Sequence, residues 1–153
     1  MKFSLVKDNL KRKEYNVKIF YDKIDNYYKI KAYNDTNIEV ANLTFKTIYS
    51  PEREIWLYNV VTNDNYKKQG YATALLKVLE YFAYMYKIDV VEGKYYPTDK
   101  NAYVFYENNG YKIYSEYYDT FLSKKIDFKQ VLSDIKPCIS DFEITETNFD
   151  KEK

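Results

Sequence analysis

The sequence predicts an α+β fold, in which a mixed, mainly antiparallel sheet is flanked by helices and followed by a C-terminal extension. Three observations support this prediction. Strand-like runs fill most of residues 14–62. The apolar period changes to three and four residues directly after Gly70. Strand and helix patterns then alternate, and 153 residues suffice for one domain with a single core.

The N-terminal half reads as an antiparallel meander of four strands. Asp/Asn-rich or Pro-containing turns separate the runs 14–22, 27–35, 37–49 and 54–62. The basic cluster KRK at 11–13 precedes them. We interpret this cluster as a solvated N-terminal arm and give it no role.

The first helix is expected to follow Gly70 and to run for about 16 residues, from the spacing of its apolar side chains. Its inward face would carry Leu75, Leu76, Leu79, Phe82, Ala83 and Tyr86. Residues 87–96 read as a strand beside the strand that precedes Gly70. The unit is therefore a β-loop-α-β arrangement.

A second helix is expected between Pro97 and Gly110, with Thr98 or Asp99 as its N-cap and Gly110 as its left-handed stop. A hairpin follows over 111–119 and 120–128. The final stretch differs, so we divide the chain into 1–126 and 127–153. Within it, residues 128–136 read as a helix, and the short acidic segment 141–153 is expected to fray at its end. One face of that helix would carry Phe128, Val131, Leu132 and Ile135.

Composition excludes several kinds of site. The chain has no histidine and a single cysteine, Cys138, so it can form neither a Ser-His or Cys-His pair nor a Cys/His zinc site. A net charge of +1 gives no broad electrostatic drive for nucleic-acid binding, which we do not expect. The 20 tyrosines suggest stacking surfaces or, alternatively, a compositional bias together with strand propensity. We expect a cytoplasmic protein without a membrane span, since no apolar run approaches about 20 residues.

The stretch NYKKQGYATALLK at 65–77 carries one of three glycines, at the junction of a loop and a helix. Backbone N–H groups at a helix start lack intrahelical partners and bind phosphate oxygens, helped by the helix dipole. Gly70 and Ala72 would let an anion approach, and Lys67 and Lys68 add charge. An ordinary loop-to-helix junction is the alternative.

Two motifs at a fixed spacing resemble the GNAT superfamily of N-acetyltransferases over residues 54–114. The family signature R/Q-x-x-G-x-G/A corresponds to Lys67, Gly70 and Ala72, with lysine in place of the usual Arg or Gln. The later signature A-x-x-F/L-Y-x-x-x-G-F/Y corresponds to Ala102, Phe105, Tyr106, Gly110 and Tyr111. Asp99 stands where the family often has Asn, with Asn101 nearby.

The resemblance implies a sheet split between its central strands and acetyl-CoA as co-substrate. It implies direct transfer of the acetyl group to a primary amine in a ternary complex, without a metal. Cofactor-binding residues would be Asn59, Val60, Val61, Lys67, Lys68, Gln69, Gly70, Tyr71, Ala72, Thr73 and Asn101. Tyr106 would be the general acid or, alternatively, a core tyrosine; Glu54 would be the base, and Glu92 is a second candidate, although either can simply be solvated.

The N-terminal half shows no match to the two helices that usually cover the acceptor site in this family. An open groove would suit an amine of a protein or peptide. The alternative function is a catalytically inactive GNAT-like binding or inhibitory module that acts through protein contacts. In that case the apolar face at 128–135 would dock a partner or form a homodimer, unless it covers its own sheet.

Overall fold

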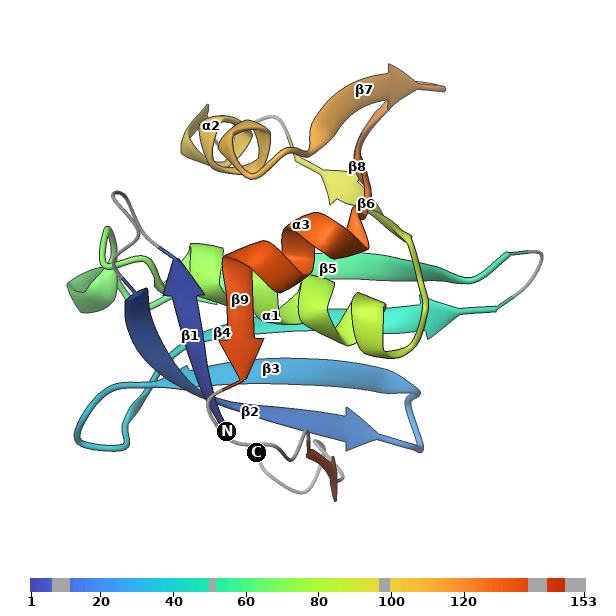
Figure 1. Ribbon diagram of the computed structural model, residues 1–153. Coiled ribbons are helices and arrows are strands. Elements are labelled where there is room, and N and C mark those ends of the chain that lie inside the picture. Colours follow the sequence, from blue (N-terminus) through green and yellow to red (C-terminus); the bar gives the residue numbers. More distant parts are fainter. Residues whose placement is uncertain (7–11, 50–51, 97–99, 138–142, 148–153) are drawn as a thin grey trace.

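The computed structural model describes residues 1–6, 12–49, 52–96, 100–137 and 143–147, which build one ten-stranded sheet with helices against it (Figure 1). The order is β7-β8-β6-β5-β4-β3-β2-β1-β9, and β10 also pairs with β2. The strands are β1 (Lys2–Val6), β2 (Arg12–Asp22), β3 (Tyr27–Tyr33), β4 (Glu39–Ile48), β5 (Glu54–Thr62), β6 (Val90–Tyr95), β7 (Lys112–Glu116), β8 (Asp119–Lys125), β9 (Ile135–Pro137) and β10 (Ile144–Thr147). The helices are α1 (Tyr71–Met85), α2 (Lys100–Asn108) and α3 (Phe128–Asp134), with a 3-10 turn at Asp64–Tyr66.

Strands β2 to β5 form the predicted antiparallel meander. Successive side chains of a strand point to opposite faces, and alternate residues of β2 are accordingly buried: Tyr15, Val17 and Ile19. The α+β prediction is confirmed, as is the parallel pairing of β5 and β6 on either side of α1.

Helix α1 is buried over most of its circumference, not only on the predicted face. Beyond the apolar residues, Glu80 is also buried, whereas Tyr86, expected to face inward, is 42% exposed. The reason is that α1 contacts β3, β4 and β5 on one side and α3, β1 and β9 on the other. Figure 1 shows α3 and β9 lying across α1. A helix that is apolar nearly all round needs such a double cover.

The C-terminal segments belong to the same sheet. β9 pairs antiparallel with β1, and β10 pairs parallel with residues 19–22 of β2, past the residues that pair with β1. The expected helix over 128–136 therefore ends at Asp134, and residues 144–147 form a strand within the acidic segment, for which no strand was predicted. Each of these short strands is stabilised by a distant partner that no local pattern reveals.

Two further expectations differ from the structure. Arg12 and Lys13 of the KRK cluster begin β2, so the expected solvated arm is wrong for these residues.

The strand expected from residue 87 begins at Val90, because Lys87 takes a left-handed conformation (φ 56°) and ends α1. The Ile88 N–H then donates to the Ala83 carbonyl at 2.8 Å. Gly110 (φ 85°) ends α2 as predicted; the proposed caps Thr98 and Asp99, like Cys138, lie outside the described residues.

The sheet divides between β5 and β6. Only three residue pairs join these strands, the last being Leu57 with Gly93. One residue later, Tyr58 is the extra residue of a bulge against β4, which bends β5. A Cβ on Gly93 would lie 2.5 Å from the Leu57 carbonyl oxygen, so the strands approach closely just where they begin to part.

Candidate cofactor site

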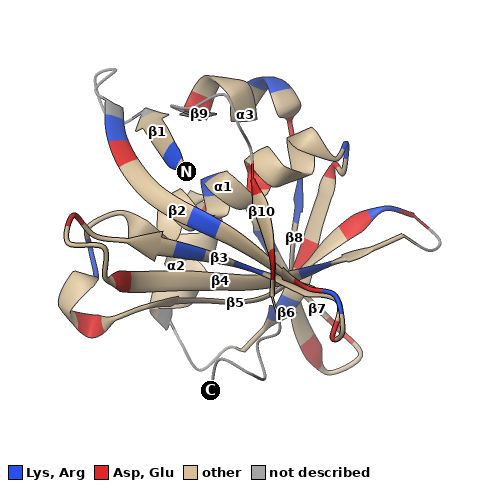
Figure 2. Cartoon of the chain, turned by 90° about the horizontal axis from the view of Figure 1, so that it is seen from below, with Lys and Arg blue, Asp and Glu red and all other residues tan. Residues whose placement is uncertain are grey.

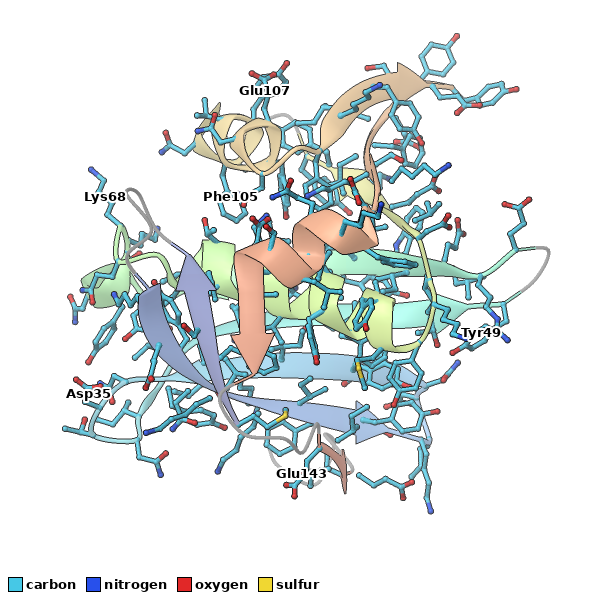
Figure 3. All side chains as sticks on the ribbon, viewed as in Figure 1. Asp35, Tyr49, Lys68, Phe105, Glu107 and Glu143 are labelled. Atoms are coloured by element: carbon cyan, nitrogen blue, oxygen red, sulfur yellow. The ribbon has the colours of Figure 1, made fainter. Side chains whose placement is uncertain are left out.

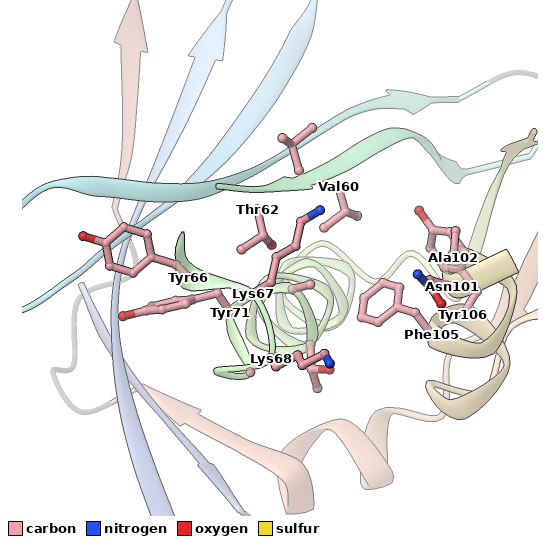
Figure 4. Close-up of a pocket in the computed structure, with 14 residues that line it drawn as sticks. Val60, Thr62, Tyr66, Lys67, Lys68, Tyr71, Asn101, Ala102, Phe105 and Tyr106 are labelled. Carbon is pink, nitrogen blue, oxygen red and sulfur yellow. The ribbon is translucent and has the colours of Figure 1, made fainter. Parts of the chain in front are cut away.

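A cavity of about 670 Å³ opens where β5 parts from β6, between the start of α1 and the inner face of α2 (Figure 4). Its size lies within the range of small-molecule and cofactor sites. It is lined by Val60, Val61, Thr62, Tyr66, Lys67, Lys68, Gly70, Tyr71, Ala72, Thr73, Asn101, Ala102, Phe105 and Tyr106. Most of the predicted cofactor-binding residues thus lie around one space.

The floor of the cavity is the N-terminal end of α1. Gly70 is the N-cap residue in the left-handed region (φ 87°), and Lys68 also has a positive φ of 65°. A non-glycine residue in this conformation costs about 1–3 kcal/mol, a strain often found at ligand loops. Closely spaced left-handed residues turn successive N–H groups into a concave anion site. The amides of the first helical turn extend this surface.

Two side chains of β2 contact this loop from outside the cavity. Lys13 Nζ donates to the Gln69 carbonyl at 3.1 Å, and Tyr15 Oη donates to the same oxygen at 3.2 Å. Their neighbour Tyr71 packs edge-on to the Tyr15 ring at 5.6 Å. Gln69, predicted to bind cofactor, does not line the cavity, because its carbonyl faces β2.

The lysines beside the loop are exposed. Lys67 forms an ion pair with Asp64 at 3.0 Å, with both side chains largely in solvent, so the pair contributes little stability and leaves Lys67 able to move. Lys68 projects outward from the loop in Figure 3. Both side chains reach the rim of the cavity (Figure 4), where their charge favours an anion.

Helix α2 supplies the opposite wall. Phe105 lies on the side of α2 toward α1, whereas Glu107 points away (Figure 3). Tyr106 is 9% exposed and its ring contacts that of Tyr111 at 5.8 Å. Tyr106 is therefore both a packed tyrosine and a cavity residue, and its role as general acid stays a prediction.

The third wall is the free part of β5. Beyond Leu57, β5 is still paired with β4 but no longer with β6. Alternate residues of this part of β5 therefore direct their backbone N–H and C=O groups toward the edge that faces away from β4. Val60, Val61 and Thr62 line the cavity, and the predicted Asn59 does not. This edge can hydrogen-bond an extended, amide-containing ligand in the manner of an added strand.

The predicted base lies apart from these walls. Glu54 is the first residue of β5 and is not among the lining residues. It neighbours Glu92 of β6, whose pKa is raised by burial first, then by the charge of Glu54 and a hydrogen bond with it, and by the charge of Glu116. The structure thus places Glu54 and Glu92 together, before the strands part.

A buried charged cluster lies behind α2 and ties it to α1. Glu80 of α1, 2% exposed, forms an ion pair with Lys124 of β8, and Lys77 lies 3.8 Å from its other oxygen. Lys124 also donates to the Asn109 carbonyl at 2.9 Å, just after α2 ends, and its Nζ lies 5.4 Å from the Tyr111 ring centre. Lys124 therefore connects α1 and α2, the two helices on either side of the cavity.

Sequence reasoning missed four lining residues: Thr62, Tyr66, Ala102 and Phe105. Ala102 and Phe105 belong to the second motif, which gave a signal for them. Thr62 directly follows Val61, the last of the predicted cofactor-binding residues on β5. Tyr66 gave no signal, since its place depends on the 3-10 turn and on its edge-on ring contact with Tyr71 at 6.4 Å.

Charges and membrane features add little to this site. Figure 2 shows acidic and basic residues scattered over the strands and turns of the described chain. Among the described residues, no group of three or more His, Cys, Asp or Glu side chains is placed to hold a metal ion. No described helix has the length and hydropathy needed to cross a bilayer.

No family model and no curated protein matches the chain at the sequence level. Solved structures match its fold. A GNAT-family acetyltransferase from Staphylococcus aureus superposes with a TM-score of 0.60 at 14% identity, covering 69% of this chain and 72% of its own. The chain has the GNAT fold.

Two other GNAT structures support this assignment. The PaiA N-acetyltransferase of Thermoplasma acidophilum, solved in complex with coenzyme A, has a TM-score of 0.59 and 18% identity over 65% of this chain and 61% of its own. The ribosomal-protein-S18-alanine N-acetyltransferase of Escherichia coli has a TM-score of 0.57 and 17% identity over 67% and 71%. In this GNAT fold, the described residues 12–49 contain strands alone, so no helix of that part covers the sheet.

Proposed function

We propose that the protein is an acetyl-CoA-dependent N-acetyltransferase that acetylates a primary amine by direct transfer in a ternary complex. One observation carries the proposal: a single cavity joins a glycine-led helix start to the free edge of a parted strand. The first suits a diphosphate and the second an extended amide-containing chain. Coenzyme A contains both groups.

The ligand fits by chemistry. The amides around Gly70 would bind the diphosphate, with Lys67 and Lys68 at the rim. The edge of β5 at Val60 and Val61 would hold the pantetheine arm and its thioester carbonyl. Asn101 offers an amide side chain from the α2 side. Support also comes from the PaiA protein of similar fold, whose structure contains coenzyme A.

The transfer step needs a base and an acid. The amine nitrogen would attack the thioester carbonyl carbon, forming the C–N bond, and loss of the thiolate would break the C–S bond. Tyr106 lines the cavity and would donate its hydroxyl proton to the departing sulfur. Backbone N–H groups of β5 would stabilise the oxyanion.

The proposed base is Glu54, acting with its neighbour Glu92. A carboxylate accepts a proton from an ammonium ion more readily when its pKa is raised toward neutrality, as it is for Glu92. Glu54 stands outside the cavity lining, so the proton would reach this pair through water or through the acceptor itself.

The acceptor is proposed to be an amine of a protein or peptide. This follows from the absence of helices within the described residues 12–49, which therefore supply no helical cover of their own for an acceptor site. An open surface admits a chain that an enclosed pocket would exclude.

Acetyl-CoA turnover measured against peptides, polyamines and aminoglycosides tests the proposal. Gly70→Glu should abolish cofactor binding, because it places a side chain and a negative charge at a left-handed position in the loop. Asn65→Glu adds the same charge to the same loop outside the cavity and is the matched control. Binding that survives Gly70→Glu would contradict the site. Binding without turnover on any acceptor would favour the non-catalytic alternative.

A further inference from the structure

The contact between β2 and the Gln69 carbonyl has no place in the proposed chemistry, yet it lies directly behind the loop. Lys13 and Tyr15 come from a strand more than fifty residues away in sequence. Both donate hydrogen bonds to one carbonyl oxygen, at 3.1 and 3.2 Å. A carbonyl with two donors, one of them an ammonium group, has little freedom to rotate.

That carbonyl belongs to the peptide unit whose N–H is the amide of Gly70. A trans peptide is planar, and its C=O and N–H point in opposite directions. Fixing the carbonyl toward β2 therefore fixes the Gly70 N–H away from β2, and Gly70 itself lines the cavity. Glycine could otherwise turn this unit over at small cost, since it tolerates both signs of φ.

The two donors also act through the peptide bond. Hydrogen bonds accepted by a carbonyl polarise the peptide unit and strengthen its N–H as a donor. Tyr15 is suited to this role because it is 3% exposed, and burial, followed by the neighbouring Tyr71, raises the pKa of its hydroxyl. The group thus stays protonated at physiological pH and remains a donor.

We infer that Lys13 and Tyr15 are positioning residues that hold the Gln69–Gly70 peptide with its N–H directed at the diphosphate of the cofactor. The inference rests on the proposed function, since it needs an anion at this loop. It gives a role to part of the KRK cluster, for which the sequence suggested none. Neither side chain touches the reacting atoms, so the effect is on affinity.

Tyr15→Phe is the cleanest test, because it removes one hydroxyl and leaves the ring packed against Tyr71. Dissociation constants are measured for coenzyme A by calorimetry and for inorganic pyrophosphate by NMR titration. We expect both to rise by a similar factor, about fivefold for one lost hydrogen bond. The Gly70 amide proton should move upfield in the free protein, a change that loss of packing elsewhere would not produce.

Matched controls exist on the same strand. Tyr21→Phe removes a hydroxyl that bonds Asn26 at the far end of β2, and it should leave both constants unchanged. Lys13→Met should weaken both ligands by about tenfold, in a manner that added salt reduces. Lys18→Met removes the same charge farther along β2, where Lys18 lies over Tyr33, and should have a smaller effect.

The outcomes separate the two proposals. If the unmodified protein binds coenzyme A and Tyr15→Phe binds both ligands equally well, the inference is overturned and the proposed function stands. If Tyr15→Phe weakens coenzyme A but not pyrophosphate, the clamp does not act on the diphosphate, and the inference again fails. If the unmodified protein binds neither ligand, the proposed function falls, and the inference falls with it.

Discussion

Removal of the lysine that ties the two helical walls together should destabilise the protein strongly. In Lys124→Met, Glu80 would lose its ion-pair partner from β8 in a site where it is 2% exposed. Loss of one partner of a buried ion pair typically costs about 3–5 kcal/mol. Lys77 remains 3.8 Å from the second carboxylate oxygen, so the lower end of this range applies. The Asn109 carbonyl also loses its donor.

We therefore expect a loss of about 3 kcal/mol in the free energy of unfolding. For a chain of this size that corresponds to a fall of about 6–12 °C in Tm. Urea unfolding followed by tyrosine and tryptophan fluorescence measures the free energy. Lys125→Met, at the exposed neighbouring position on β8, is the control and should stay within about 0.5 kcal/mol of the unmodified protein.

The double variant Glu80→Met with Lys124→Met separates packing from charge. Replacing both partners of a buried pair by apolar side chains is often neutral or stabilising. The double variant should therefore recover most of the loss. The reasoning is refuted if Lys124→Met is as stable as Lys125→Met, or if the double variant is less stable than Lys124→Met.

Three other predictions concern the strands and the site. Gly93→Ala should cost about 1–3 kcal/mol in urea unfolding, because its Cβ would lie 2.5 Å from the Leu57 carbonyl oxygen; unchanged stability would show that the strands can shift. Because the pKa of Glu92 is raised in the folded protein, this residue contributes to the free energy of unfolding in acid. That contribution is lost as the pH rises through the folded-state pKa. Glu92→Gln should thus gain stability relative to the unmodified protein between pH 4 and pH 7.5, and a constant difference would contradict this. Tyr106→Phe should lower kcat about 100-fold with unchanged affinity for coenzyme A, whereas Tyr103→Phe, on the exposed side of α2, should not.

Local signals in the sequence were sufficient where a single residue determines the backbone. Gly110 ends α2 in the predicted left-handed conformation, and Gly70 lies at the predicted junction of loop and helix, where its positive φ was not predicted. Lys87 adopts the same left-handed geometry at the end of α1 without glycine, and sequence gave no sign of it. There the buried Ile88 holds the turn, so tertiary packing determines the conformation.

Elements that depend on distant partners could not be predicted. β1 is five residues long, and β9 is three residues long and pairs with it across at least 130 positions. Neither strand is long enough to show a recognisable alternation of apolar and polar residues. The role of Lys13 was hidden for the same reason: a basic side chain near the start of the chain looks solvated until β2 is placed beside the loop.

The site was predictable where motifs name consecutive residues and not where the fold decides which way a residue faces. Gly70 to Thr73 line the cavity together, as a helix start must. Asn59 and Gln69 belong to the same predicted segments but face elsewhere, because the bulge at Tyr58 and the contact with β2 turn them. Glu54 is separated from the cavity by the length of β5.

The pairing of β9 with β1 has a consequence for synthesis on the ribosome. Residues 3–5 are made long before residues 135–137, so the outer edge of their strand has no partner until those residues have been added. During that interval the bare edge offers unpaired amides and carbonyls to any other nascent chain. Translation that stalls before residue 135 would leave an aggregation-prone intermediate, even though the whole stretch from Gly70 to Gly110 had already been translated.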